Sequence, residues 1–465
     1  MVRLHISALV AVFAAATAVY ADGAIKCGAN NNCPADTPCC SQYGECGVGA
    51  YCLGGCDPLF SHSLDSCAPA PVCRSSDYKF KDLSQVQANT KYLGDSSKAN
   101  WVSSGEPVVY SDQVLLTMPQ SSVGTLLAST AYVWYGKVSA TLKTSGGAGV
   151  VTAFILLSDV KDEIDFEFVG TDTTHAQSNY YFQGITDYDN ELNITVDSDT
   201  FQNYHTYEID WTPDQITWSI DGVVGRTKSR NTTWNSTRNQ YDYPQTPARV
   251  QLSLWPAGLP SNGAGTVAWA GGQIQWSSPY MTNGYYYAMV SDVNVECYDP
   301  PQGANVTGSK SYIFNSAAGT NDTVATVNDP TILSSFEATG ENPKLGASSS
   351  SASSGAKKSG KKTGSSAAAS SSAAAPQVPG LSGGRPGDNS AQSASASSES
   401  SASSATGAST AATAKSTAGS NGFSQGGSSS SSNSKGSGAS PVKSERILQG
   451  SLFAGLIAIV GAIAL

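Results

Sequence analysis

The chain has 465 residues with a formal net charge of −10, and only 13% of its residues are charged. Such a chain repels polyanions, so we expect no nucleic-acid partner and look instead to a neutral polymer. The composition changes from Cys- and Gly-rich to aromatic-rich to Ser/Ala/Gly-rich along the chain, which predicts several segments rather than one uniform domain.

Residues 1–21 have the features of a secretory signal peptide. Arg3 and His5 precede an apolar stretch from Ile6 to Val19, and the small residues near Ala21 predict cleavage after that position. Secretion would place the mature chain in an oxidising compartment.

Residues 22–67 are predicted to form a small module that buries little core and depends on disulfides. Nine of the ten cysteines lie between Cys27 and Cys73, and the tenth is Cys297. Zinc is the competing interpretation, but Cys39 and Cys40 are adjacent and no histidine lies among the first seven cysteines. We therefore expect disulfides, with no metal and no cofactor.

Residues 74–300 are rich in aromatic residues and in short strand patterns, and no long amphipathic helix interrupts them. Turn signals such as Asp221-Gly222 separate the strands. The pattern predicts an all-β sandwich, whose two sheets bury their apolar faces and leave a concave outer face for a substrate. The expected strands include Gln113–Met118, Val133–Leu142, Val151–Leu157, Tyr207–Trp211, Ile216–Ile220 and Arg249–Trp255.

The seven residues from Asp162 to Phe168 alternate acidic and apolar side chains with the period of a strand. Three carboxylates then share one face, and the apolar residues between them point to the core. Crowded carboxylates split their pKa values, as a glycosidase requires of its acid and its nucleophile. An ordinary solvent-facing strand and a Ca²⁺ site remain as alternatives. The acids are Glu163, Asp165 and Glu167, and the apolar residues are Ile164, Phe166 and Phe168.

Two further groups are candidates for a sugar-binding cleft. The period of a strand places Arg249, Gln251, Ser253 and Trp255 on one face, where Trp255 is either a sugar platform or a core residue. Three residues shortly after the acidic run are weaker cleft candidates: Gln177, Asn179 and Tyr180.

Residues 305–440 are predicted to be a disordered stalk, because their Ser/Ala/Gly composition buries too little apolar surface. The uncharged stretch Ile447–Leu465 ends without a tail, and a polar spacer precedes it. This layout predicts a GPI-anchor signal over residues 441–465, with attachment near Gly436 or Gly438 and no transmembrane helix in the mature protein. A short C-terminal membrane anchor is the alternative. Glycosylation sequons occur at Asn193, Asn231, Asn235, Asn305 and Asn321.

The acidic run resembles the Glu-x-Asp-x-Glu signature of glycoside hydrolase family sixteen, in the form shared by plant xyloglucan transglycosylases and fungal Crh cell-wall enzymes. The segments 253–258 and 269–272 resemble the downstream cleft segment of Crh proteins. The resemblance implies a jelly-roll sandwich and a retaining double displacement. It implies Glu163 as nucleophile, Glu167 as general acid/base and sugar contact, Asp165 as orienting residue, and Gln251, Trp255 and Thr266 as further sugar contacts.

A geometric difficulty accompanies these roles. Positions i and i+4 of a straight strand are roughly 13 Å apart at Cα, whereas the carboxyls of retaining glycosidases are about 5–5.5 Å apart. We therefore expect either convergent side chains or a bend in the strand.

The N-terminal module, from Cys33 through Cys39-Cys40-Ser41 to Tyr51-Cys52, resembles the hevein-like chitin-binding domain. The resemblance implies that Ser41 binds an N-acetyl group and that Tyr43 and Tyr51 stack on sugar rings. Glu45 replaces the second aromatic of the usual pair, so weak chitin affinity or a purely structural knot is also considered. The implied disulfides are Cys27–Cys40, Cys33–Cys46, Cys39–Cys52, Cys56–Cys67 and Cys73–Cys297.

Together these resemblances predict an enzyme of the fungal cell wall, secreted and held at the membrane by a GPI lipid. It would use chitin as donor and β-1,6- or β-1,3-glucan as acceptor, through a covalent glycosyl-enzyme intermediate. The alternatives are an endo-acting β-glucanase or chitinase, and an inactive wall-anchored lectin. The intact set of three acids argues against the lectin.

Overall fold

A computed structural model describes residues 25–347, and these residues form the predicted all-β fold. The signal peptide, most of the predicted stalk and the anchor signal with Gly436 and Gly438 lie outside the described residues. Within residues 25–347, no helix has the length and apolar character needed to cross a membrane.

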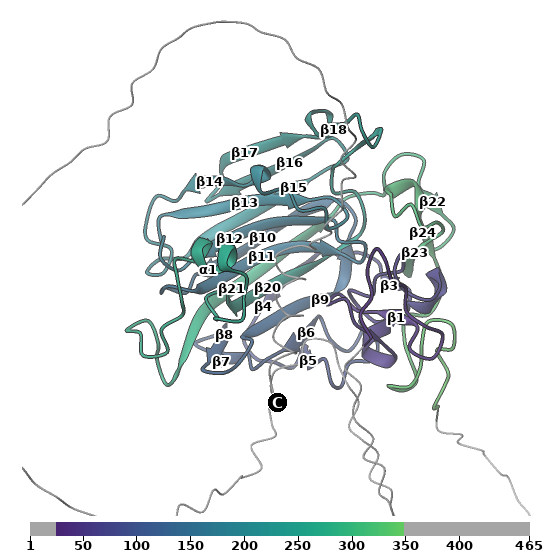
Figure 1. Cartoon of the computed structure of the whole chain (residues 1–465), viewed down its shortest axis with the longest axis horizontal. Coiled ribbons are helices and arrows are strands. Elements are labelled where there is room, and N and C mark those ends of the chain that lie inside the picture. The colour runs from purple at the N-terminus through teal and green to yellow at the C-terminus, as the bar shows by residue number, and fades with distance from the viewer. Residues whose placement is uncertain (1–24, 348–465) are drawn as a thin grey trace, which may run out of the picture. The chain divides into compact units, whose positions relative to one another are not determined.

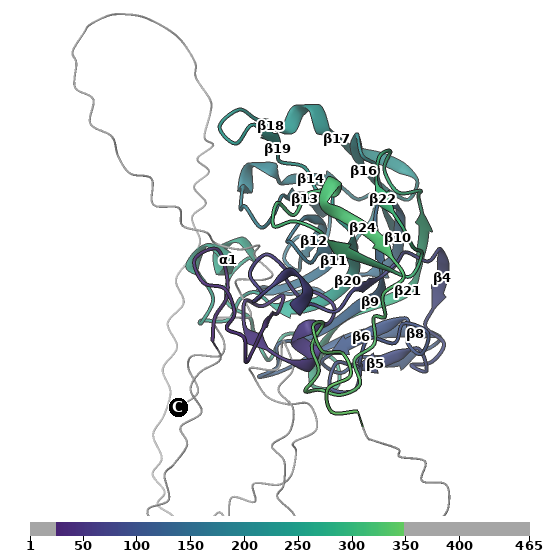
Figure 2. The same cartoon turned by 90° about the vertical axis from the view of Figure 1, so that its right-hand side faces the viewer.

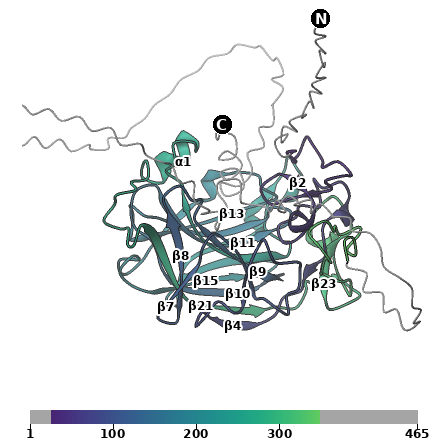
Figure 3. The same cartoon turned by 90° about the horizontal axis from the view of Figure 1, so that it is seen from below.

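Two eight-stranded sheets form a sandwich (Figures 1 and 3). Nearly all of their strand pairs are antiparallel, as expected for a jelly roll; β5 and β6 pair in parallel. We call the sheet that carries the acidic run the cleft sheet and the other the back sheet. The cleft sheet has the order β14 (Leu192–Thr195), β13 (His175–Tyr181), β12 (Glu163–Val169), β11 (Val150–Ser158), β20 (Ala248–Pro256), β9 (Thr125–Val133), β6 (Trp101–Ser104), β5 (Val86–Ala88).

The back sheet lies on the other side of the core (Figure 3). Its long strand β21 lies between β10 and β8 and ends at Cys297. The order is β17 (Val223–Ser229), β16 (Gln215–Ile220), β15 (His205–Trp211), β10 (Gly136–Lys143), β21 (Tyr285–Cys297), β8 (Gln113–Pro119), β7 (Val108–Tyr110), and β4 (Ser76–Lys79) also pairs with β21.

The apolar half of the acidic run builds the core between the sheets, as predicted. Ile164, Phe166 and Phe168 are buried in the main cluster. The ring of Tyr207, from β15, lies 5.4 Å from Phe166 and 4.6 Å from Phe168 in edge-on geometry. The indole of Trp218 donates a 3.0 Å hydrogen bond to the backbone carbonyl of Asp165. The acidic strand is thus fixed from behind by the opposite sheet.

Most predicted strands are present, and Val133–Leu142 is wrong as a single strand. The chain turns at Trp134-Tyr135 between β9 and β10, which belong to different sheets. Tyr135 adopts a φ of 62°, which bulky residues rarely do. Two aromatic residues of high strand propensity therefore make the crossing, and their burial in the core compensates for the unusual backbone. The predicted turn at Asp221-Gly222 does join β16 and β17.

The N-terminal module consists of short elements and disulfides. All five expected pairs occur: Cys27–Cys40, Cys33–Cys46, Cys39–Cys52, Cys56–Cys67 and Cys73–Cys297. Three sulfurs, of Cys27, Cys33 and Cys40, lie close together, but each is in a disulfide and offers no thiolate to zinc. The elements are β1 (Cys39–Cys40), β2 (Cys46–Gly47), η1 (Gly49–Cys52) and η2 (Leu64–Ser66).

The predicted start of the stalk at residue 305 is wrong, because residues 305–347 are folded. A four-stranded sheet joins this C-terminal segment to the stretch just after the module, through the pair β3–β23 (Figure 1). Its other strands, β22 and β24, are labelled in Figure 2. Tyr312, Val324 and Ala325 are buried there, which the low aromatic content of the segment concealed. The strands are β3 (Ala70–Pro71), β22 (Asn305–Val306), β23 (Ser311–Phe314) and β24 (Val324–Val327).

The remaining elements are short and lie in connections. The one α-helix among the described residues, α1, covers only six residues, consistent with the absence of a long amphipathic pattern. They are α1 (Ala264–Trp269), η3 (Tyr188–Asn190), η4 (Arg230–Thr233), η5 (Asn321–Thr323), β18 (Trp234–Asn235) and β19 (Gln240–Tyr241).

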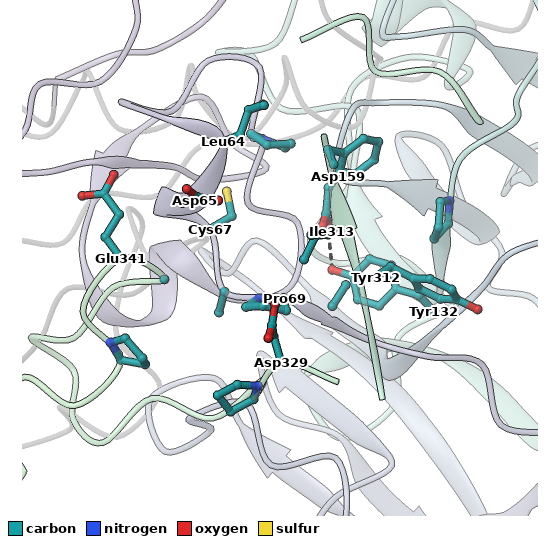
Figure 4. Close-up of a pocket in the computed structure, with 18 residues that line it drawn as sticks. Leu64, Asp65, Cys67, Pro69, Tyr132, Asp159, Tyr312, Ile313, Asp329 and Glu341 are labelled. Carbon is teal, nitrogen blue, oxygen red and sulfur yellow. Dashed lines mark hydrogen bonds between the residues drawn. The ribbon is translucent and has the colours of Figure 1, made fainter. Parts of the chain in front are cut away.

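A cavity of about 430 Å³ lies where the module, the sandwich and the C-terminal segment meet (Figure 4). Its lining includes Asp65, Tyr132, Asp159, Tyr312 and Glu341. The Tyr132 hydroxyl donates a 2.8 Å hydrogen bond to Asp159. None of the three acids of β12 lines this cavity, so it is separate from the candidate active site.

Candidate active site

The three acids of β12 lie on the face of the cleft sheet that points away from the core. Their exposed fractions are 3% for Glu163, 1% for Asp165 and 8% for Glu167. This burial argues against an ordinary solvent-facing strand, whose carboxylates would be exposed to water. The pairing of β12 with β11 and β13 has no register shift, so no bulge bends the strand. The carboxyls can therefore converge only through side-chain direction and strand twist.

The pKa values of two of these acids are raised. Burial raises the pKa of Glu167 to about 8, with a further contribution from the charge of Glu163. Burial also raises the pKa of Asp165 well above its ordinary value, helped by the charges of Glu163 and Glu167 and by a hydrogen bond with Glu163. Glu167 is thus protonated at neutral pH, which is the state a general acid needs. A protonated Asp165 can donate to Glu163 and orient it.

The neighbouring strand β13 supplies polar side chains directly beside the acids. Its register pairs Gln177 with Glu167, Asn179 with Asp165, and Tyr181 with Glu163. The charges of all three acids raise the pKa of Tyr181, after the larger effect of burial. Asn179 donates a 2.8 Å hydrogen bond to the Tyr181 hydroxyl. The structure therefore places the candidates Gln177 and Asn179 on the face of the acids and adds Tyr181.

Tyr180 was expected in the cleft, and this prediction is wrong. It pairs with Ile164, belongs to the core cluster, and lies under the guanidinium of Arg226 at 5.7 Å. Strand alternation explains the difference, since Tyr180 is one residue out of phase with Gln177 and Asn179. Counting by two from Gln177 would have found Tyr181 in its place.

The other neighbour of β12, strand β11, contributes an apolar floor. Ala153, Ile155 and Leu157 pair with Glu167, Asp165 and Glu163 in turn. Oxygen donors would be needed here for Ca²⁺, and none comes from this side. The apolar floor instead strengthens the electrostatic interaction among the acids by keeping water away.

Strand β20 continues the same face beyond the floor. Gln251 pairs with Ile155 and Ser253 with Ala153, as the period predicted. The Gln251 Oε1 and Ser253 Oγ atoms are buried and have no hydrogen-bond partner among the described residues. Buried polar atoms without partners are uncommon and suit the binding of a hydroxyl-rich ligand. The structure thus supports Gln251 as a sugar contact and adds Ser253.

A pair of tryptophans lies on the outer face of the cleft sheet, beyond Ser253. The ring of Trp255 stacks on that of Trp269 at 6.1 Å and 26°. Trp255 belongs to the small cluster on the outer face of the cleft sheet, with Ile155 and Leu157, and not to the main core. Trp255 therefore lies on the face of the acids and not in the core between the sheets. Trp269 comes from α1, and Thr266 is a half-buried residue of the same helix.

The candidate chitin-binding residues are buried in the structure. Exposed fractions are 1% for Ser41, 6% for Tyr43 and 5% for Tyr51. The Ser41 hydroxyl accepts a hydrogen bond from the backbone of Glu45, and Tyr51 packs in a cluster with Leu333 of the C-terminal segment. In this arrangement neither Tyr43 nor Tyr51 presents the open ring face that stacking on chitin would need. The alternative of a structural knot fits better.

Comparison with known proteins identifies the family. The family model "Glycosyl hydrolases family 16" matches residues 95–271. Over 345 residues the chain is 61% identical to Crh-like protein 3 of Botryotinia fuckeliana, covering 74% of this chain and 77% of that protein. It is 49% identical over 338 residues to Congo red hypersensitive protein 2 of Saccharomyces cerevisiae, covering 72% of each.

Among solved structures, one similar chain is a Crh5 transglycosylase in complex with NAG. It has 31% sequence identity and a TM-score of 0.47, and the match covers 58% of this chain and all of that one. The residue pattern that predicted the family, the jelly-roll sheets and the sequence relatives agree. The chain belongs to the fungal Crh-like proteins and carries a catalytic domain of glycosyl hydrolase family 16.

Proposed function

We propose that the protein is a retaining transglycosylase that cleaves chitin and transfers the released chain to β-1,6- or β-1,3-glucan in the cell wall. The observation that carries the proposal is the row of three acids on one buried strand face, in which the pKa of Glu167 is raised. Glu167 holds a proton up to a pH of about 8. Asp165 shares a hydrogen bond with Glu163. A retaining mechanism needs this combination of a protonated acid and an oriented nucleophile.

The first displacement forms a glycosyl-enzyme. A carboxylate oxygen of Glu163 attacks the anomeric carbon of the donor, and the bond from that carbon to the glycosidic oxygen breaks. Glu167 delivers its proton to the departing oxygen. The negative charge thereby moves from Glu163 to Glu167, while protonated Asp165 keeps the reacting carboxyl in place.

The second displacement returns the enzyme to its starting state. Glu167, now a base, takes a proton from a hydroxyl of the acceptor, and the acceptor oxygen bonds to the anomeric carbon as the ester to Glu163 breaks. Water can complete the same step, so the cleft decides between transfer and hydrolysis. The Trp255–Trp269 pair and the apolar floor favour a stacked sugar acceptor over water.

The test uses the secreted protein with chitin oligosaccharides and a fluorescent β-glucan acceptor. Labelled hybrid products are expected, and a Glu163→Gln variant should form none while keeping its fold. Shortened chitin without label transfer would support the chitinase alternative instead. Chitin binding without any reaction would support the lectin and overturn the proposal.

The same proposal includes secretion and a lipid anchor. The signal peptide, the serine-rich stalk after residue 347 and attachment near Gly436 or Gly438 together would hold the catalytic domain outside the membrane. Release of the protein from cells by a phosphatidylinositol-specific phospholipase is the expected result. Among the sequons, Asn193, Asn231 and Asn305 are exposed and are the preferred glycan sites.

A further inference from the structure

The N-terminal module sits directly on the cleft sheet. Oε1 of Gln42 accepts a 2.8 Å hydrogen bond from the Arg249 guanidinium and a 3.4 Å hydrogen bond from the Gln251 amide. Both partners belong to β20, two strands from the catalytic acids. Gln251 is also one of the expected sugar contacts. A residue of the module therefore meets the row of cleft residues on the same face of the sheet.

Beyond β20, the module occupies the face of the sheet. Tyr43 lines a cavity of only about 60 Å³ together with Val102 and Ser104 of β6 and Ala128 of β9. The register places Ala128 opposite Gln251 and Val102 opposite Ala128, so all three lie along one line across the strands. A space of this size admits water molecules and excludes a sugar ring.

The module is fixed to the sandwich on one side by buried contacts. The Gly55 amide donates hydrogen bonds of 2.9 Å to Asp159 and 3.0 Å to the Tyr132 hydroxyl. A Cβ atom at Gly54 would lie 2.5 Å from the Arg249 guanidinium, so the module approaches the side chain of this β20 residue closely at that point.

The C-terminal segment holds the module from the other side. Gly49 donates a hydrogen bond to the carbonyl of Ala338, and Gly340 donates one to that of Ser66. Both hydroxyls of Ser63 and Ser66 donate to the Glu341 carboxylate. Figure 3 shows the module on the same outer side of the cleft sheet as α1, toward the opposite end of the strands.

We propose that the docked module is the end wall of the sugar-binding cleft, in which Gln42 and Tyr43 set how many sugar units bind on the β9–β6–β5 side. This rests on the proposed function, since it assigns a limit to that same cleft. Sugar chains that cross the sheet from the acids meet Gln251 last and then the module. On the strands beyond it, Val102, Ser104 and Ala128 line the small space beside Tyr43, which leaves no room for a further sugar unit. The module thus acts in length selection rather than as a free chitin-binding unit.

The test compares Tyr43→Ala with the matched Tyr43→Phe, which retains the ring and so retains the wall. Transfer rates are measured for the full-length secreted protein over a series of chitin oligosaccharides as donors and a series of β-glucan oligosaccharides as acceptors. In one of the two series, the kcat/KM of wild type and of Tyr43→Phe should stop rising beyond a certain oligosaccharide length. Beyond that length, the kcat/KM of Tyr43→Ala should still rise, by roughly fivefold for the first added sugar unit. This is the gain that one new hydrogen bond would give.

Three other results have defined meanings. Identical length profiles for the two variants would overturn the inference while leaving the proposed function intact. An equal rise in rate at every length would also overturn it, because it indicates a lid that moves away rather than an end wall. Absence of hybrid product with wild type would overturn the proposed function itself. Thermal unfolding checks that each variant is folded. If Tyr43→Ala does not fold, Gln42→Ala takes its place, since it also removes a side chain of the end wall.

Discussion

Trp269 donates a 2.8 Å hydrogen bond from its indole nitrogen to Oε1 of Gln177. This bond ties the short helix α1 to β13, one strand from the catalytic acids, and Gln177 is the register partner of Glu167. The same indole stacks on Trp255 of β20. One side chain therefore links both sides of the cleft across the acid/base residue.

The first prediction concerns that link. Trp269→Phe keeps a ring to stack on Trp255 and loses the donor, while Gln177→Leu loses the acceptor. Each change should raise the KM for sugar substrates by roughly tenfold, and the two should couple by about 1 kcal/mol in a double-mutant cycle. Additive effects of the two substitutions would show that the hydrogen bond does not position the wall.

The second prediction concerns the pH dependence of the rate. Glu167 must be protonated to act as acid, and its pKa is about 8. The rate of glycosyl-enzyme formation should therefore be maintained through neutral pH and fall above a pH of about 8. Glu167→Gln should lower the rate by about 10²–10⁴ with a poor leaving group and remove the alkaline limb. A limb that persists in Glu167→Gln would assign it to another residue.

The raised pKa of Glu167 also predicts how the stability of the protein depends on pH. Glu167 binds its proton more tightly in the folded protein than in the unfolded chain, where its pKa is near 4.5. Its contribution is therefore fully present below about 4.5 and is lost as the pH rises through about 8. The raised pKa of Asp165 acts in the same direction. Urea unfolding between these pH values should show a smaller decline for Glu167→Gln than for wild type.

The third prediction separates the two adjacent tyrosines of β13. Tyr181→Phe removes the hydroxyl that binds Asn179 beside the acids and should reduce kcat/KM by roughly tenfold. Tyr180→Phe, its matched control, alters the core side of the strand and should leave kcat/KM within about twofold. Equal kinetic losses in the two variants would contradict the face assignment of β13.

The fourth prediction concerns Asp162, which precedes the catalytic acids. Its carboxylate accepts hydrogen bonds from the backbone amides of Gln183, Gln245 and Thr246 and from the Thr246 hydroxyl. Asp162→Ala should reduce the free energy of unfolding by about 3–5 kcal/mol, because it leaves these buried donors without an acceptor. Asp162→Asn retains one carbonyl acceptor and should lose less. Chemical denaturation measures both.

The sequence was sufficient for the face of β12, because a strict alternation of acids and apolar residues has one interpretation on a strand with a buried side. The period of a strand was also sufficient to place Gln251 and Trp255 on one face of β20, but it left open whether Trp255 is a sugar platform or a core residue. It failed at Tyr180, where the phase of β13 was not established, and at Tyr135, where burial overrides the preference of a bulky residue for extended backbone.

The position of the module could not be predicted from the sequence. Gln42 and Arg249 are 207 residues apart, and their hydrogen bond depends on how two separately patterned regions meet. The hevein-like spacing describes the module alone and indicates an open sugar-binding face. The C-terminal segment, whose few apolar residues carried no clear periodicity, buries Tyr51 and changes that interpretation.

The Cys73–Cys297 disulfide encloses 224 positions of the chain and therefore nearly the whole sandwich. In the chain-entropy account, closing a loop of this length stabilises the fold by about 5 kcal/mol. It also means that a protease that cuts any loop between the two cysteines leaves both fragments covalently joined. A nicked molecule would then keep its sheets together long enough to go on working outside the cell, where damaged copies are not repaired.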